Sequence, residues 1–115
     1  GDFNIAPYEN DVWSHKQLLK VVSHTPPETD RLADMLDSLD WVDTARHFID
    51  SEEKAYTWWS YRNRDWRKSN RGCRLDHIWV TQPLKTKLKT YKTLEEARDW
   101  EKPSDHIPVM IELAI

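Results

Sequence analysis

The feature that most constrains the fold of this chain is an amphipathic helix expected at residues 26–39. Thr25 can cap its N-terminus, Pro26 suits the first turn, and Glu28 completes a capping box. Four apolar residues then recur at helical spacing, namely Leu32, Met35, Leu36 and Leu39. A stripe of this kind packs against something flat, so the helix is expected to flank a sheet.

Several short strands are expected beside this helix. The alternation of Val109, Ile111, Leu113 and Ile115 predicts a strand over residues 107–115. Other patterns predict strands at 56–61, 74–81 and 88–93, a short helix within 11–20, a helical turn at 93–100 and a connector at 41–48. The 115 residues fit one domain without internal repeats. The expected class is therefore α/β (α+β), with residues 1–115 in a single domain.

Composition excludes some classes of protein. No stretch approaches the roughly 20 apolar residues that a membrane span needs, and no charged-then-apolar start indicates a secretory signal. The lone Cys73 cannot form an internal disulfide and suggests a reducing compartment.

Charge is distributed unevenly along the chain. The net charge is −3, so the chain as a whole does not attract nucleic acid. Acidic residues dominate 28–53, whereas a later interval is basic and contains Arg62, Arg64, Arg67, Lys68, Arg71 and Arg74. Trp58, Trp59 and Trp66 lie among or beside these arginines, and such interleaving can hold unstacked bases. From charge alone, a solvated basic loop is the simpler explanation.

Polar residues suited to phosphoester hydrolysis follow or end the expected strands: Asp2 with Asn4, Asp76, and Asp105 with His106. Asp2 can hold a divalent cation or orient water, and Asn4 can donate to a phosphoryl oxygen. His106 can stabilise negative charge or act as a base. A carboxylate behind it, Asp76 or Asp105, would fix its tautomer.

Each cluster also has a plainer explanation. An Asp-x-Asn sequence is commonly a turn with side chain to backbone hydrogen bonds, and Asp105–His106 after a proline is commonly a surface loop. Asp76 on an apolar strand face has to be paired or to bind something. The joint occurrence of the three clusters favours a catalytic site.

Four blocks carry a family resemblance, and they occur in the order 1–7, 56–62, 70–77 and 102–109. Together they resemble the exodeoxyribonuclease III branch of the endonuclease/exonuclease/phosphatase superfamily. The Gly-Asp-x-Asn and Ser-Asp-His sequences indicate only the superfamily. The tryptophan-rich block and the Asn-Arg-Gly-x-Arg-Leu-Asp block point to the repair nucleases.

The resemblance implies the C-terminal half of a four-layer αββα sandwich with mostly antiparallel strands. It implies a cytoplasmic enzyme that uses Mg²⁺ or Mn²⁺ to remove nucleotides from 3′ ends of double-stranded DNA and to incise at abasic sites. The corresponding catalytic residues are Asp2, Asn4, Asp76 and His106. The corresponding metal site contains Asp2, Asn4, Asp105 and His106. The substrate contacts are expected from Trp58, Arg62, Asn70, Arg71 and Arg74.

Two departures from the family pattern affect the expected activity. The family's metal-binding glutamate and two further site residues lie in an N-terminal part without a counterpart here. The chain is therefore expected to be about half of the enzyme, to be inactive alone and to expose apolar surface. Cys73 also stands where some relatives carry a bulky pocket residue. The rival hypotheses are a phosphatase or lipid phosphodiesterase of the same superfamily, and a DNA-binding fragment without catalysis.

Overall fold

The computed structural model describes residues 1–115 and shows a mixed α/β fold with antiparallel strand pairs. The helices are α1 His15–Leu18, α2 Pro26–Ser38, α3 Thr44–Phe48, α4 Trp66–Ser69 and α5 Gln82–Lys85, with 3-10 turns η1 Glu9–Asp11 and η2 Glu95–Asp99. The strands are β1 Val42–Asp43, β2 Trp58–Trp59, β3 Gly72–Cys73, β4 Trp79–Val80, β5 Leu88–Thr93 and β6 Val109–Leu113. No helix combines the length and apolar character needed to cross a membrane.

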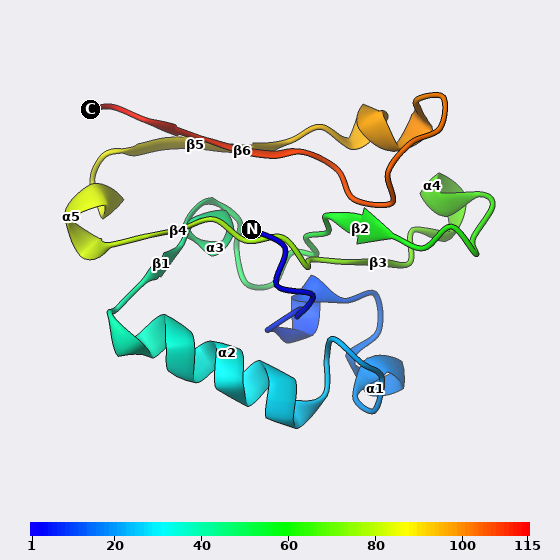
Figure 1. The fold of residues 1–115 in the computed structure, drawn as a ribbon, viewed down its shortest axis with the longest axis horizontal. Helices are drawn as coiled ribbons and strands as arrows, with labels where there is room; N and C mark the ends of the chain where they lie inside the picture. The colour runs from blue at the N-terminus through cyan, green and yellow to red at the C-terminus, as the bar shows by residue number, and fades with distance from the viewer.

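Residues 72–80 connect most of the molecule. Their first strand, β3, pairs with β2, and their last strand, β4, pairs with β1. Between them, Asp76 pairs with Asp2 in an isolated bridge. Figure 1 shows this segment running through the middle of the molecule, with the β5–β6 ribbon on one side and α2 on the other. The N-terminus and two distant segments, β1 and β2, therefore meet along one stretch of backbone.

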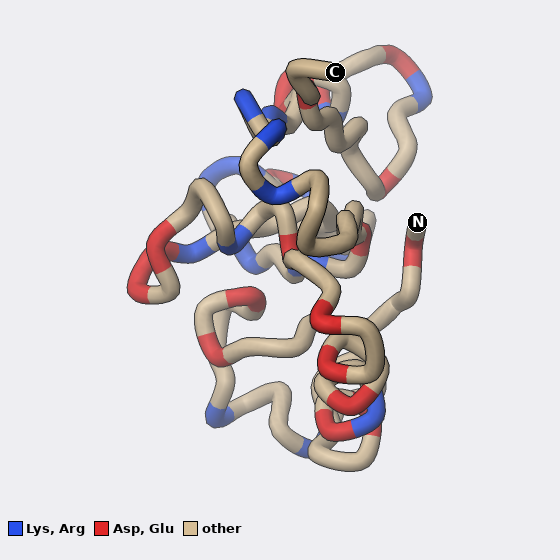
Figure 2. Tube along the Cα trace, turned by 90° about the vertical axis from the view of Figure 1, so that its left-hand side faces the viewer, with Lys and Arg blue, Asp and Glu red and all other residues tan.

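The expected helix at 26–39 is confirmed as α2, which begins one residue after Thr25. The Glu28 carboxylate accepts hydrogen bonds from the Thr25 hydroxyl at 2.7 Å and from the Ser23 amide at 2.8 Å. Its apolar stripe is only partly covered, because Leu32 is buried whereas Met35 is 45% exposed. Figure 2 shows acidic residues gathered on the turns of α2, where Arg31 is the one basic residue.

The prediction of a plain connector at 41–48 is wrong. This segment forms β1 and then α3, because the Asp43 side chain accepts from the Arg46 amide and caps the helix. The Thr44 hydroxyl donates to the Ile78 carbonyl at 2.6 Å and ties α3 to the central segment.

The expected strands at 56–61 and 74–81 are shorter than predicted, with only Trp58–Trp59 and Trp79–Val80 in regular pairing. Pairing is interrupted because the amides of Leu75 and Asp76 donate to the Thr57 hydroxyl rather than to a backbone carbonyl. The expected strands at 88–93 and 107–115 are confirmed as β5 and β6, and the turn at 93–100 is confirmed as η2.

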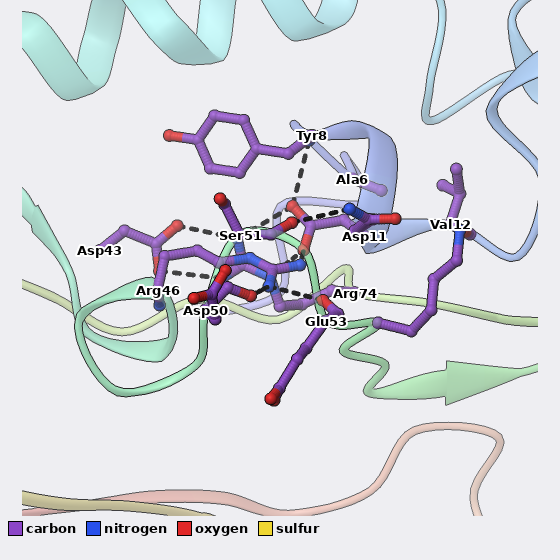
Figure 3. Close-up of polar contacts among 12 residues, drawn as sticks. Ala6, Tyr8, Asp11, Val12, Asp43, Arg46, Asp50, Ser51, Glu53 and Arg74 are labelled. Atoms are coloured by element: carbon purple, nitrogen blue, oxygen red, sulfur yellow. Dashed lines mark hydrogen bonds and ion pairs between the residues drawn. The ribbon is translucent and has the colours of Figure 1, made fainter.

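A buried ion-pair network joins the central segment to its neighbours. Arg74, fully buried, donates to both carboxylate oxygens of Asp11 at 2.7 and 3.0 Å and to both of Asp43 at 2.9 and 2.8 Å. Arg46 adds a 2.6 Å contact to Asp11. Figure 3 shows these side chains converging from three separate segments. The paired geometry satisfies a charge that would otherwise be costly to bury.

Candidate active site

The backbone brings three catalytic candidates together from distant parts of the chain. Asp2 pairs with Asp76, and His106 pairs with Trp58, which itself pairs with Cys73 three residues before Asp76. The side-chain ligand atoms of Asp2, Asp76 and His106 all lie within 4.8 Å of one another. The convergence follows from strand pairing.

Asp76 and His106 form the closest pair in this cluster. His106 Nδ1 lies 2.8 Å from Asp76 Oδ2, and since a carboxylate can only accept, the histidine donates. The Thr57 hydroxyl donates to the same oxygen at 2.6 Å. Thr57 is completely buried, and its oxygen accepts hydrogen bonds from two backbone amides. The fixed hydroxyl of Thr57 therefore fixes the orientation of the Asp76 carboxylate.

The remaining nitrogen of His106 points toward Asp2. Its Nε2 lies 3.6 Å from Asp2 Oδ2. The side chains of His106 and Asp2 are 28% and 39% exposed, while that of Asp76 is 19% exposed. The cluster therefore has an oriented carboxylate on its inner side, and a histidine and a second carboxylate that are partly exposed to solvent.

Asn4 is positioned by a turn at the start of the chain. Its backbone amide donates to Asp2 Oδ1 at 2.9 Å, and its φ of 53° lies in the left-handed region that asparagine tolerates. The turn explanation of Asp-x-Asn is thus correct, and the same turn fixes the Asp2 carboxylate beside His106. Asn4 itself is exposed and lines the neighbouring cavity.

Asp105 lies outside this cluster. Its Oδ2 accepts a 2.9 Å hydrogen bond from the indole Nε1 of Trp58. Of the residues expected at the metal, Asp2 and His106 belong to the group whose ligand atoms lie within 4.8 Å of one another, and the third member of that group is Asp76 rather than Asp105.

The cluster offers oxygen ligands of the kind that a hard divalent cation requires. Mg²⁺ prefers oxygen ligands, typically one or two carboxylates with several waters. Asp2 fits this role, because it is exposed and its Oδ2 has no closer partner than the 3.6 Å histidine nitrogen. Asp76 Oδ2 already accepts two hydrogen bonds. The chain therefore fits a cation through Asp2, with His106 and Asp76 at its border.

Three expected substrate residues line one cavity of about 560 Å³: Trp58, Arg62 and Arg71. Asn70 lines a different cavity, and its side-chain oxygen accepts from the indole of Trp59 at 3.0 Å. The prediction that Arg74 contacts substrate is wrong, because its guanidinium is fully buried between Asp11 and Asp43.

Three residues near the site were missed by the sequence analysis. Thr57 supports Asp76, His24 lines the 560 Å³ cavity, and Trp13 lines it beneath the Arg71 guanidinium, 4.7 Å from the ring centre. Trp13 could have been found from the sequence, since it is a large aromatic residue close to the Asp-x-Asn sequence. Thr57 could not, because a threonine among aromatic strand residues does not indicate a role in a site.

Burial makes Cys73 a packing residue of this cavity. Desolvation raises the pKa of its thiol to about 12, with the negative charge of Asp11 acting in the same direction. The reactive thiolate form is therefore negligible at neutral pH.

Comparisons with known proteins agree with this geometry. A family model described as the endonuclease/exonuclease/phosphatase family matches residues 1–106. An exodeoxyribonuclease of Bacillus subtilis is 31% identical over 109 residues, which cover 95% of this chain and 41% of that protein.

Two solved structures share the fold. An AP endonuclease from Archaeoglobus fulgidus superimposes with a TM-score of 0.93 at 30% identity, covering 100% of this chain and 44% of the other. A 3′ phosphatase from Neisseria, bound to a product DNA hairpin, gives 0.90 at 31% identity, with coverage of 100% and 44%. The chain spans less than half the length of the relatives it matches.

Proposed function

The chain belongs to the endonuclease/exonuclease/phosphatase family, and we propose that it supplies Asp2, Asp76 and His106 to a centre that hydrolyses DNA phosphodiesters. The observation that carries the proposal is the continuous contact from Thr57 through Asp76 and His106 to Asp2. A structural ion pair would not need an exposed histidine nitrogen facing a second, exposed carboxylate.

The proposed roles follow from which atoms are free. Asp76 is occupied by Thr57 and His106, so it orients the imidazole and fixes the proton on Nδ1. Nε2 of His106 is left to meet a phosphoryl oxygen or to exchange a proton with the attacking water. Asn4 is an uncharged donor beside Asp2 and can bind a phosphoryl oxygen without repulsion.

We infer that Mg²⁺ or Mn²⁺ is held through Asp2. Such a cation supplies positive charge to the phosphoryl oxygens and acidifies water. Asp105 would support the site indirectly through Trp58. Asn4 and His106, which were also expected as ligands, would then contact substrate.

Double-stranded DNA is the proposed substrate, at abasic sites and 3′ ends. The cavity beside the cluster is lined by Arg62, Arg71, Trp13 and Trp58, which suits a phosphate backbone and an unstacked residue. In the full architecture, we infer that this chain forms one part of a four-layer αββα sandwich. The relatives' remaining length would complete both the sandwich and the cation site.

The test uses a chimaera, in which this chain replaces its matched segment of the Bacillus subtilis exodeoxyribonuclease. The chimaera should incise a duplex containing one abasic site in the presence of Mg²⁺. His106→Ala should lower the rate about 100- to 10,000-fold, the usual contribution of a positioned acid or base. His47→Ala, which removes an exposed histidine on α3, is the matched control.

The substrates decide between the family activities. Parallel assays with a 3′-phosphorylated duplex and with an inositol phosphate would separate a DNA-directed enzyme from one acting on small phosphoesters. Hydrolysis of the inositol phosphate alone would overturn the proposal. Equal rates for His106→Ala and His47→Ala would also overturn it.

A further inference from the structure

Two histidines outside the candidate active site face each other where α1 meets the turn before α2. His15 is the first residue of α1, and His24 lies two residues before α2 begins. His15 Nδ1 lies 2.7 Å from His24 Nε2, and the two rings are nearly perpendicular, with centroids 5.0 Å apart. His24 is buried, whereas the side chain of His15 is 40% exposed. Each ring therefore turns one inner nitrogen toward the other ring.

The outer nitrogen of each ring faces an oxygen atom. His24 Nδ1 lies 2.7 Å from the Ala6 carbonyl, and since a carbonyl can only accept, this nitrogen carries a proton. His15 Nε2 lies 3.6 Å from Glu9 Oε1. Carbonyl and carboxylate partners of this kind orient the histidines of metal sites, because they hold the proton on the outer nitrogen and leave the inner nitrogen to the ion.

Two neutral histidines cannot satisfy all of these contacts without a cation. His24 has its proton on Nδ1, so its Nε2 accepts and His15 has to donate from Nδ1. The Nε2 of a neutral His15 then presents a lone pair to the Glu9 carboxylate, which also only accepts. A cation between the inner nitrogens removes this conflict, because the His15 proton then lies on Nε2 and faces Glu9.

The geometry admits a transition-metal ion after a small movement. Zinc lies about 2.0–2.1 Å from an imidazole nitrogen, so two nitrogens at tetrahedral positions are roughly 3.3 Å apart. The 2.7 Å separation of the inner nitrogens therefore has to open by roughly 0.6 Å. His15 can supply this movement, because it is partly exposed at the start of a four-residue helix, while His24 is held by the Ala6 carbonyl.

We propose that His15 Nδ1 and His24 Nε2 bind one divalent transition-metal ion of the zinc class, with water completing its coordination. The His15 proton moves from Nδ1 to Nε2 and is donated to Glu9. The ion fastens α1 to the turn before α2. Imidazole nitrogens suit zinc, copper and nickel, whereas the cation proposed at Asp2 is a hard ion that takes oxygen ligands, so the two sites are separate.

The test follows the histidine ring nitrogens of the 115-residue chain by proton–nitrogen NMR during titration with zinc chloride. The titration is made at about pH 8, where imidazole in solution is neutral. Before zinc is added, His15 and His24 should both carry their proton on Nδ1. Zinc should move the His15 proton to Nε2 and shift the signals of His15 Nδ1 and His24 Nε2 together. Each histidine has its own signals, so zinc bound at His106 is distinguished from zinc bound at this pair.

Variants connect the binding of zinc to the pair. His15→Ala should weaken the binding seen at His24 Nε2 by about tenfold or more, because one of two protein ligands is lost. Glu9→Gln should weaken it by a smaller factor, because Glu9 is 76% exposed and only holds the outer proton of His15. His47→Ala removes an exposed histidine of α3 and is the matched control, which should bind zinc at the pair like the original chain.

Three results would overturn the inference. One is the absence of any shift of His24 Nε2 when zinc is in large excess, and another is a His15 proton that stays on Nδ1 in the zinc-bound chain. The third is equal zinc affinity of His15→Ala and His47→Ala. The first two are measured on the original chain, so they decide the inference even if His15→Ala does not fold. None of these results bears on cleavage by the chimaera.

Discussion

The indole Nε1 of Trp58 donates a 2.9 Å hydrogen bond to Oδ2 of Asp105, the residue immediately before His106. The backbones of the same two segments are also joined, because the Trp59 amide donates to the Asp105 carbonyl and His106 pairs with Trp58. Asp105 thus anchors the histidine loop to the wall of the cavity. The position of the Trp58 indole and the position of His106 are consequently linked.

Trp58→Phe keeps an aromatic wall but removes this anchor. A hydrogen bond to a charged group contributes about 1.5–3 kcal/mol, and partial exposure of this pair places the expected loss of unfolding free energy near 1 kcal/mol. The measurement is urea unfolding, together with the kcat of the chimaera, which should fall because the His106 loop is released. Trp100→Phe, at an exposed site, is the control. An unchanged kcat would contradict the link.

The second prediction concerns the buried Arg74. Arg74→Met leaves Asp43 without its ion-pair partner and leaves Asp11 with Arg46 alone, and breaking a buried pair in this way costs about 3–5 kcal/mol. Urea unfolding of the chain should show that loss. Arg67→Met is the control, because Arg67 forms an exposed pair with Asp99 whose attraction is screened by solvent, so its loss should change the stability little. Similar losses for the two variants would show that the buried network does not stabilise the fold.

The third prediction is a pH dependence from His77. Burial lowers the pKa of this histidine below its ordinary 6.5, and the positive charge of Arg74 acts in the same direction. Neutral His77 fits its contacts, because Nε2 can donate to the Ile5 carbonyl at 2.8 Å while Nδ1 faces the Arg74 guanidinium. A lowered pKa means that the unfolded chain binds the proton more readily than the folded chain.

The sign of the effect follows from linkage. The stabilisation is complete above pH 6.5 and is lost as pH falls through the lower folded pKa. Melting temperature should therefore fall on acidification from pH 7 toward pH 5. His77→Gln should reduce this slope, whereas His47→Gln should not. A slope that is the same in both variants would contradict the assignment to His77.

The fourth prediction concerns an exposed apolar patch made of Phe3, Met35, Leu39 and Trp41. Phe3, Met35 and Leu39 are 40%, 45% and 64% exposed, and a cavity of about 360 Å³ lies between Phe3, Met35 and Trp41. Apolar patches of this kind drive association. Sedimentation should show self-association that increases with concentration. Met35→Glu should weaken it, while Met110→Glu on β6 serves as control, and a monomer at all concentrations would contradict the prediction.

Elements with local signals were predictable from the sequence. The helix at 26–38 follows from its capping residues and stripe, and β6 follows from strict alternation of apolar residues. The residues of the candidate site were predictable as three polar clusters, because their chemistry is specific even when their spacing is not. Asp76 drew attention as an acid on an apolar strand face.

Features that depend on distant partners were not predictable. Arg74 stands in a basic interval, but Asp11 and Asp43, which bury it, lie 63 and 31 residues away in the sequence. Thr57 shortens the expected strands because its hydroxyl replaces a backbone acceptor. The hydrogen bond from the Trp58 indole to Asp105 likewise joins residues that are 47 positions apart. Each of these features comes from a long-range side-chain contact.

If Asp2, Asp76 and His106 form one cation-assisted phosphate site, titration with Mn²⁺ followed by NMR should locate the ion at this cluster. Substoichiometric Mn²⁺ broadens signals of nearby residues through paramagnetic relaxation. The signals of Asp2, Asn4 and His106 should broaden first, and Asp2→Asn should abolish this selectivity while Asp30→Asn on α2 leaves it intact. Broadening centred on the acidic residues of α2, or equal broadening in the Asp2→Asn chain, would contradict it.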